Sequence, residues 1–145
     1  MDLRIIDGGD GLPPEPDWSM HYGDSLDVAS AQDDWGLIVR EMQGAETISV
    51  YNGEAIKRLV MFGIEFKRAA NHVAKHGAII KGKTTGSGGM WNPHWSVMRQ
   101  ADGAIRALEA ELGLAPRRRA AAVKAKRRRS RRTAADDYLG PPSRG

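Results

Sequence analysis

Residues 92–132 read NPHWSVMRQADGAIRALEAELGLAPRRRAAAVKAKRRRSRR, and this stretch guides the interpretation of the whole chain. Its first half has the signals of a capped helix. Asn92 can cap the N-terminus, Pro93 suits the first helical position, and Gly113 and Pro116 follow the C-terminus. Apolar residues between these caps recur at helical spacing, which predicts an amphipathic helix. The second half is almost purely cationic, so a packing surface is joined directly to a polyanion-binding surface.

Two earlier segments repeat the helical pattern. The first, over about 26–43, would be capped by Ser25 and closed by Gly44, and the second would begin near residues 49–52 and end at Gly77. Each carries a narrow apolar seam of the kind that packs against another long helix. Residues 78–91 combine Gly, Ser and Thr with two short apolar runs. We therefore expect a small β-hairpin or an extended excursion between the second and third helices.

These patterns predict an all-α fold that assembles into an oligomer. We expect the first two helices to form a long antiparallel hairpin, with the third packed along it or on the next subunit. With six per cent aromatic residues in 145, a monomer would have a modest core, and oligomerisation would bury more apolar surface. The seam residues expected to support assembly are Trp35, Ile38, Met42, Ile56, Leu59, Phe66, Met98, Ile105, Leu108 and Leu112.

Composition divides the chain into four regions. Residues 1–24 form an acidic arm rich in Gly and Pro, which we expect to be flexible, and residues 25–116 form the helical oligomerisation core. Residues 117–134 form an Arg-rich helix or tail, and residues 135–145 form a disordered C-terminus. Trp18, Met20 and Tyr22 are unusual in a flexible arm. Contact of the arm with the core or with a neighbouring subunit would explain them.

The net charge of +4 conceals a strong separation of charge. Residues 1–46 hold 11 acidic and 2 basic side chains, whereas residues 117–145 hold 2 acidic and 11 basic ones. Ten bases of the tail follow one another without an intervening acid: Arg117, Arg118, Arg119, Lys124, Lys126, Arg127, Arg128, Arg129, Arg131 and Arg132. Such a run neutralises phosphates and releases counterions, which predicts salt-sensitive, largely sequence-independent binding to nucleic acid. A solvated charge run, or a segment that binds an acidic protein, is the alternative.

No pattern supports a catalytic, metal or cofactor site. Residues 77–84 fit the phosphate-binding motif G-x-x-x-x-G-K-[ST], but a helix precedes them and no helix can begin directly after them, so we interpret the match as fortuitous. His72 and His76 lie one helical turn apart, yet no third metal ligand is evident, and two surface histidines near a helix C-terminus are the favoured interpretation.

The chain also lacks signals for export or membrane insertion. It contains no cysteine, which excludes disulfides and thiolate metal sites. No apolar run approaches the ~20 residues of a membrane span. The N-terminus lacks the basic and then apolar pattern of a signal peptide, so we expect a cytoplasmic protein.

The order of these features resembles the small subunits of phage terminases, the DNA-packaging motors of tailed phages. The acidic N-terminal region, where no helix-turn-helix is evident, and the long Arg-rich extension depart from the family pattern. The resemblance spans about residues 35–119 and is carried by Trp35, Gly77, Asn92, Pro93, Ala101, Leu108, Leu112, Gly113, Leu114, Ala115, Pro116, Arg117, Arg118 and Arg119.

The resemblance implies a non-catalytic helical subunit that assembles into a homo-oligomeric ring. Such a subunit binds double-stranded viral DNA and recruits and regulates the large subunit, which carries the ATPase and nuclease, in the host cytoplasm. Three alternatives remain open on the sequence alone. They are an oligomeric architectural DNA-binding protein of the nucleoid type, a phosphate-loop enzyme, and a head–tail connector that binds a portal ring rather than DNA.

Overall fold

The computed structural model describes residues 11–82, 86, 88–116 and 124. The element order in that part is η1 (Trp18–Met20), α1 (Ser25–Gly44), η2 (Val50–Asn52), α2 (Gly53–His76), β1 (Ile79–Ile80), β2 (Met90–Trp91) and α3 (Pro93–Glu111). The described part is therefore mostly helical, with one small two-stranded sheet. The predictions of three helices, and of a short β-hairpin between the second and third, are confirmed.

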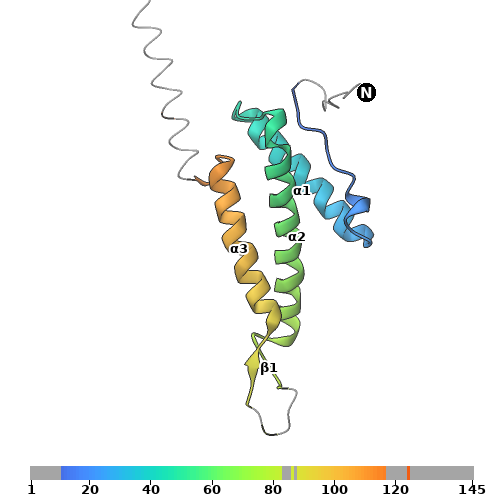
Figure 1. Ribbon diagram of the computed structural model, residues 1–145, viewed down its shortest axis with the longest axis vertical. Coiled ribbons are helices and arrows are strands. Elements are labelled where there is room, and N and C mark those ends of the chain that lie inside the picture. Colours follow the sequence, from blue (N-terminus) through green and yellow to red (C-terminus); the bar gives the residue numbers. More distant parts are fainter. Residues whose placement is uncertain (1–10, 83–85, 87, 117–123, 125–145) are drawn as a thin grey trace, which may run out of the picture.

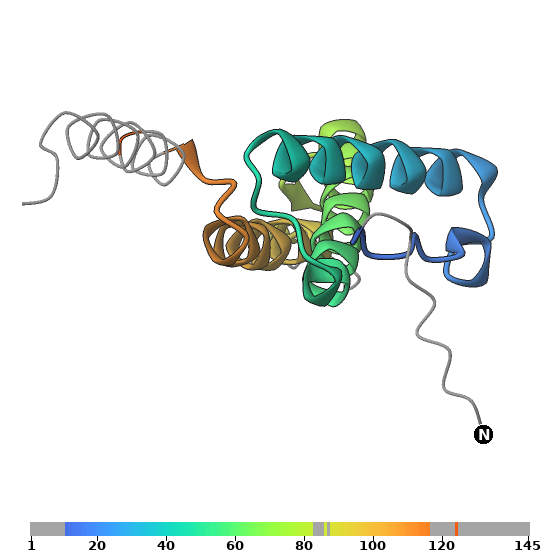
Figure 2. The ribbon, with the colours of Figure 1, turned by 90° about the horizontal axis from the view of Figure 1, so that it is seen from above.

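The helices α2 and α3 run antiparallel and side by side, and α1 crosses α2 (Figures 1 and 2). Contacts between α2 and α3 extend along both helices, whereas α1 contacts α2 over a shorter stretch. The prediction that the first two helices form the antiparallel hairpin is therefore wrong, because the hairpin consists of α2 and α3. The third helix does pack along a neighbour in the same chain, as one of the two predicted arrangements required.

The connectors explain this choice of partners. The strands β1 and β2 pair antiparallel with Ile79 opposite Trp91 and Ile80 opposite Met90, so the chain reverses direction directly between α2 and α3. A side chain at Gly89 would collide with Ile79, which makes glycine necessary at the close approach of the two strands. The connector from α1 to α2 instead contains Glu46 with a φ of 57° and the turn η2, and α2 leaves it at a steep angle to α1 (Figure 2).

Asn92 joins the end of α2 to the start of α3. Its Oδ1 accepts a hydrogen bond from the backbone N–H of His94 at 3.0 Å, as the N-cap prediction required. Its Nδ2 donates to the carbonyl oxygen of Gly77 at 3.0 Å, and its own backbone N–H donates to Ala78 at 2.8 Å. The side chain is fully buried. Because burial of an amide is unfavourable without hydrogen bonds, these bonds fix the position of Asn92 between the two helices.

The ends of α1 differ from the predicted ones. Asp24, not Ser25, is the N-cap, and its Oδ1 accepts from the backbone N–H of Leu26 at 2.8 Å. A carboxylate is favourable there because the helix N-terminus carries a partial positive charge. At the other end, the residue with left-handed backbone is Glu46 rather than Gly44, and the following Thr47 N–H reaches back to the Met42 carbonyl oxygen. Gly77 and Gly113 do have the positive φ expected after α2 and α3.

The core lies where α1, α2, the C-terminal part of α3 and the segment before α1 meet. The Trp18 ring contacts the Trp35 ring edge to face, with the ring centroids 6.0 Å apart, and Tyr22 is also buried. Part of the arm predicted over residues 1–24 is thus built into the core, and Met20 is exposed. The buried apolar residues of this cluster are Trp18, Tyr22, Ala31, Trp35, Val39, Met42, Ala55, Ile56, Leu59, Val60, Ile64, Leu108 and Leu112.

Among the described residues, no helix has the length and apolar character needed to cross a bilayer.

We predict that Asn92→Ala lowers the free energy of unfolding by about 2 kcal/mol, because it removes an N-cap and the side-chain donor to the carbonyl of Gly77. Urea unfolding followed by circular dichroism measures this change. Asn92→Asp retains an acceptor for the N-cap but has no donor for Gly77, and it should fall between the two. Asn71→Ala, at an exposed position on α2, is the control. Equal stability of Asn92→Ala and Asn71→Ala would contradict the proposed role.

Candidate functional site

The Arg-rich tail begins directly after the folded core. Leu112 is buried, Leu114 packs against the core cluster, and Pro116 is the last described residue before the arginines. Lys124 is exposed. The nine other residues predicted to bind DNA lie outside the described residues. The structure therefore fixes where the tail leaves the core, next to the C-terminal end of α3.

The ten residues predicted to support assembly fall into two groups. Ile38, Phe66, Met98 and Ile105 are half-buried and thus partly open to a partner. The remaining residues are buried within the subunit itself: Trp35, Met42, Ile56, Leu59, Leu108 and Leu112. Much of the apolar seam therefore serves the core of the single chain.

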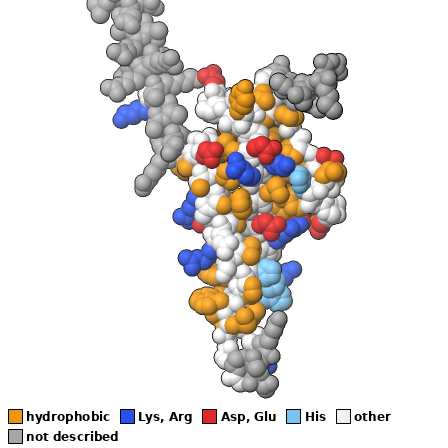
Figure 3. Space-filling model, in the orientation of Figure 1, with side chains coloured by type: hydrophobic (Ala, Val, Ile, Leu, Met, Phe, Trp, Pro, Cys, Tyr) orange, Lys and Arg blue, Asp and Glu red, His pale blue; other side chains and the backbone are white. Residues whose placement is uncertain are grey.

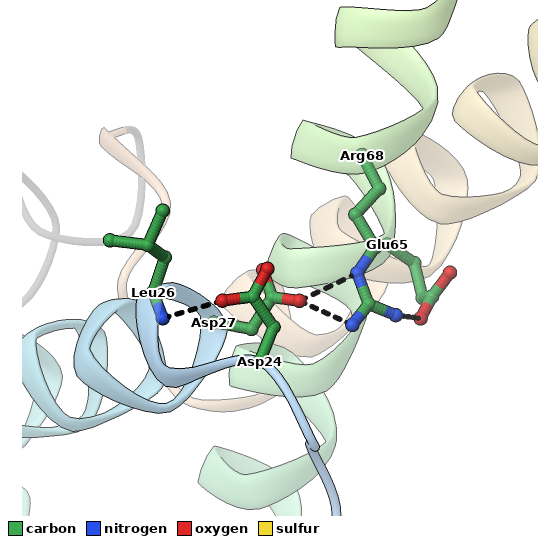
Figure 4. Close-up of polar contacts among 5 residues, drawn as sticks. All are labelled: Asp24, Leu26, Asp27, Glu65 and Arg68. Atoms are coloured by element: carbon green, nitrogen blue, oxygen red, sulfur yellow. Dashed lines mark hydrogen bonds and ion pairs between the residues drawn. The ribbon is translucent and has the colours of Figure 1, made fainter.

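Two ion-paired groups hold α1 against α2. The Arg68 guanidinium donates from Nε to the Asp27 carboxylate at 3.0 Å and from Nη1 to Glu65 at 3.1 Å (Figure 4). Hydrogen bonding to Asp27 raises the pKa of Arg68 above its usual value. The second group is Lys67, whose Nζ donates to Asp34 at 2.7 Å and to Ser30 at 2.9 Å. These contacts are largely exposed, so each contributes at most about 1 kcal/mol, and salt weakens them.

Tyr22 extends the Arg68 group toward the core. The Arg68 guanidinium carbon lies 5.2 Å from the centre of the Tyr22 ring, within the range of a cation–π contact. Burial, followed by the charge of Glu65, raises the pKa of the Tyr22 hydroxyl above its usual value. Arg68 therefore links α1, α2 and the segment before α1 through one guanidinium.

Three histidines gather where α2 ends and α3 begins. The ring centroids of His72 and His76 are 4.3 Å apart, and those of His72 and His94 are 3.7 Å apart in a stacked arrangement. The Nδ2 of Asn92 lies 3.1 Å from the Nδ1 of His72. Loss of hydration lowers the pKa of His72, and the neighbouring His94 and His76 lower it further. Within residues 11–82, 86, 88–116 and 124, no three His, Asp or Glu side chains are arranged to hold a metal ion.

The match to the phosphate-binding motif has the wrong structural context. Gly77 ends α2 with a φ of 82°, and the strand Ile79–Ile80 lies inside the supposed loop. A phosphate-binding loop follows a strand and leads into a helix, whose N-terminus faces the phosphates. Here a helix precedes the motif and a strand follows its first residue. Lys83 and Thr84, which would contact phosphate and magnesium in such a loop, lie outside the described residues.

Comparison with protein families gives the assignment. A family model described as phage terminase, small subunit, matches residues 31–129, well over half of the chain. The chain belongs to this family. The match begins within α1, covers α2, the β-hairpin and α3, and continues into the Arg-rich tail of this terminase small subunit. The family resemblance inferred from the sequence is thereby confirmed. No match was found among curated proteins or among solved structures.

Two features of this small subunit escaped prediction from the sequence. The first is the contact of Arg68 with Asp27, which are far apart in the chain and carry no local signal of pairing. The second is an exposed apolar end of the β-hairpin, made of Ile79, Met90 and Trp91. Figure 3 shows hydrophobic side chains gathered at this end, near the histidines. The sequence did hold a signal for this exposed end. Neighbouring side chains of a strand point to opposite faces, so two adjacent apolar residues on each short strand place apolar side chains on both faces of the sheet.

We predict that the stability of the folded subunit falls as the pH is lowered from about 7.5 to 5.5. The pKa of His72 is below its ordinary value of 6.5 in the folded chain, so the unfolded chain takes up the proton first and is favoured as the pH falls. Thermal unfolding at several pH values measures the effect. His72→Gln should flatten this dependence, whereas His21→Gln, outside the histidine group, should not. An equal pH dependence in His72→Gln and the unaltered chain would refute the assignment.

Proposed function

We propose that this chain is the DNA-binding regulatory subunit of a phage packaging motor. In this proposal it assembles with copies of itself into a ring, binds double-stranded viral DNA through the Arg-rich tail, and recruits and regulates the large ATPase-nuclease subunit in the host cytoplasm. The family match over residues 31–129 is the observation that carries the proposal. It includes residues 117–129, so eight of the ten basic residues of the tail lie within the matched region.

The position of the tail supports this mechanism. The ten basic side chains follow directly on a core whose last residues, Leu112 and Leu114, pack against the rest of the subunit. Every copy in an assembly would therefore present its tail from an equivalent point. Many weak phosphate contacts then add as avidity, because binding by one tail raises the effective concentration of the next. The small subunit itself performs no catalysis in this proposal, and the large subunit supplies the chemistry.

We predict that replacement of the ten basic residues of 117–132 by Gln strongly weakens duplex binding and its dependence on salt. Each phosphate contact contributes about −0.9 to the slope of log K against log salt, so the loss of the contacts should bring the slope close to zero. Fluorescence anisotropy of a labelled duplex at several salt concentrations measures the slope.

A variant with all ten positions as Lys is the matched control, since it retains the charge and should retain most of the slope. Sedimentation should show the same assembly for all three proteins, because the tail lies outside the helical core. Unchanged duplex binding by the Gln variant at moderate salt would exclude the tail as the DNA contact.

We further predict that the chain changes the ATPase rate of the large terminase subunit of the same phage by at least severalfold in the presence of DNA. An architectural DNA-binding protein, the second candidate because of the basic tail alone, would have no such effect. Lys83→Ala should behave like the unaltered chain, because the phosphate-loop match has no functional role in this proposal. An ATPase rate that is the same with and without the chain would favour the architectural candidate.

A further inference from the structure

Two apolar surfaces of this subunit remain open in the described structure, and they carry opposite charge. The first is the hairpin end, which we define as Ile79, Met90 and Trp91. Trp91 is 63 % exposed, and its ring is stacked on that of Trp95 with the centroids 6.2 Å apart. A sheet of two strands with two residues each is only marginally stable in water without further packing. An apolar cluster of this kind at one end of a molecule marks an interaction surface.

The chain around the hairpin end is basic. Residues 69–101 contain four Lys and Arg side chains and no Asp or Glu, whereas Lys67 and Arg68, earlier in α2, are paired with acids. Lys75, Lys81 and Arg99 are exposed among them, and the three histidines add charge when protonated. The half of the α2–α3 pair that ends in the β-hairpin therefore favours an acidic partner that also offers apolar surface.

The second surface is a groove between α1, α2 and α3, with a volume of about 330 Å³. Its apolar lining includes Leu37, Ile38 and Val60, and Leu37 is 61 % exposed. Carboxylates of Glu41 and Glu109 also line the groove, as does that of Asp34, which is paired with Lys67. The surrounding chain is acidic, since residues 11–65 hold ten acidic and three basic side chains.

The groove and the hairpin end of one copy cannot meet. Val60 lies in the third turn of α2, and the β-hairpin follows the last turn at His76. The 16 residues between them span about 24 Å along the helix at 1.5 Å per residue. Their charges and their apolar character are nevertheless complementary. Two copies of the chain can satisfy both surfaces at once.

We propose that the hairpin end of one copy docks on the acidic groove of a second copy. The inference rests on the proposed self-assembly and specifies its interface. Because two different surfaces meet, each pair of docked copies still has one free hairpin end and one free groove, so the contact can repeat from copy to copy. Such a head-to-tail contact closes into a ring when the rotation between copies allows it.

The test is the mass of the full-length protein by sedimentation velocity over a range of concentrations. Trp91→Glu damages only the hairpin end, and Leu37→Glu damages only the groove. Both side chains are mostly exposed, so the fold should persist, which circular dichroism checks. We expect each variant to assemble at least tenfold more weakly than the unaltered chain. Tyr51→Glu, at a 95 % exposed aromatic residue outside both surfaces, is the control and should assemble normally.

Mixing the two variants separates this contact from a symmetric one. The intact hairpin end of Leu37→Glu can dock on the intact groove of Trp91→Glu, so an equimolar mixture should form dimers that grow no further. A symmetric contact between two hairpin ends would leave Leu37→Glu dimeric alone and would overturn the proposal. So would a Trp91→Glu variant that assembles normally but loses affinity for DNA, because the hairpin end would then be a nucleic-acid contact.

Salt gives a second measurement that needs no substitution. Assembly should weaken between low and high salt, because opposite charges meet at the interface. Reversal of charge on both surfaces, with Lys75→Glu and Lys81→Glu combined with Glu41→Lys and Glu109→Lys, should restore assembly that either pair alone weakens. If the unaltered chain assembles and none of these variants changes it, the interface is wrong while self-assembly stands. A chain that stays monomeric at all concentrations would refute both.

Discussion

The hydrogen bonds of Asn92 determine the arrangement of the rest of the molecule. The buried amide donates to Gly77 at the end of α2 and accepts from His94 at the start of α3, so it fixes where one helix stops and the other begins. Together with the pairing of β1 and β2, this sets α2 and α3 antiparallel. The β-hairpin consequently lies at one end of the pair and the start of the Arg-rich tail at the other. The exposed apolar residues of the hairpin and the point where the tail leaves the core therefore lie at opposite ends of the α2–α3 pair.

The sequence predicted the elements of the fold better than their pairing. The caps of α3 are as predicted, because Asn92, Pro93 and Gly113 each have a local physical reason for their position. Which helices would pair was not predictable from their seams, because all three have similar apolar spacing. The connectors decided it, through the pairing of residues 79–80 with residues 90–91. The sequence pattern also could not decide between two neighbouring residues that can both cap a helix, such as Asp24, which is the N-cap of α1, and Ser25.

For the candidate site, charge was the informative signal and apolar spacing was ambiguous. The basic tail is evident from composition. Ten cations without an intervening acid repel one another and do not form a packed core, so they indicate binding to a polyanion. Apolar spacing cannot separate core from interface. Trp35 and Leu108 proved to be buried within the chain, whereas Trp91, which lies outside any helical seam, is exposed. The contact of Arg68 with Asp27 joins residues 41 positions apart and has no sequence signature at all.

The distribution of contacts among the three helices also favours an order of folding. Contacts between α2 and α3 join neighbours across a short connector, so little chain entropy opposes their formation, and such local pairs form fast. The segment around Trp18 and α1 precede α2 in the chain and bury their apolar faces only after α2 is present. During synthesis, α1 therefore leaves the ribosome before α2 and α3, which supply the rest of its core cluster. The short connector favours early formation of the α2–α3 hairpin, against which these earlier residues can then pack.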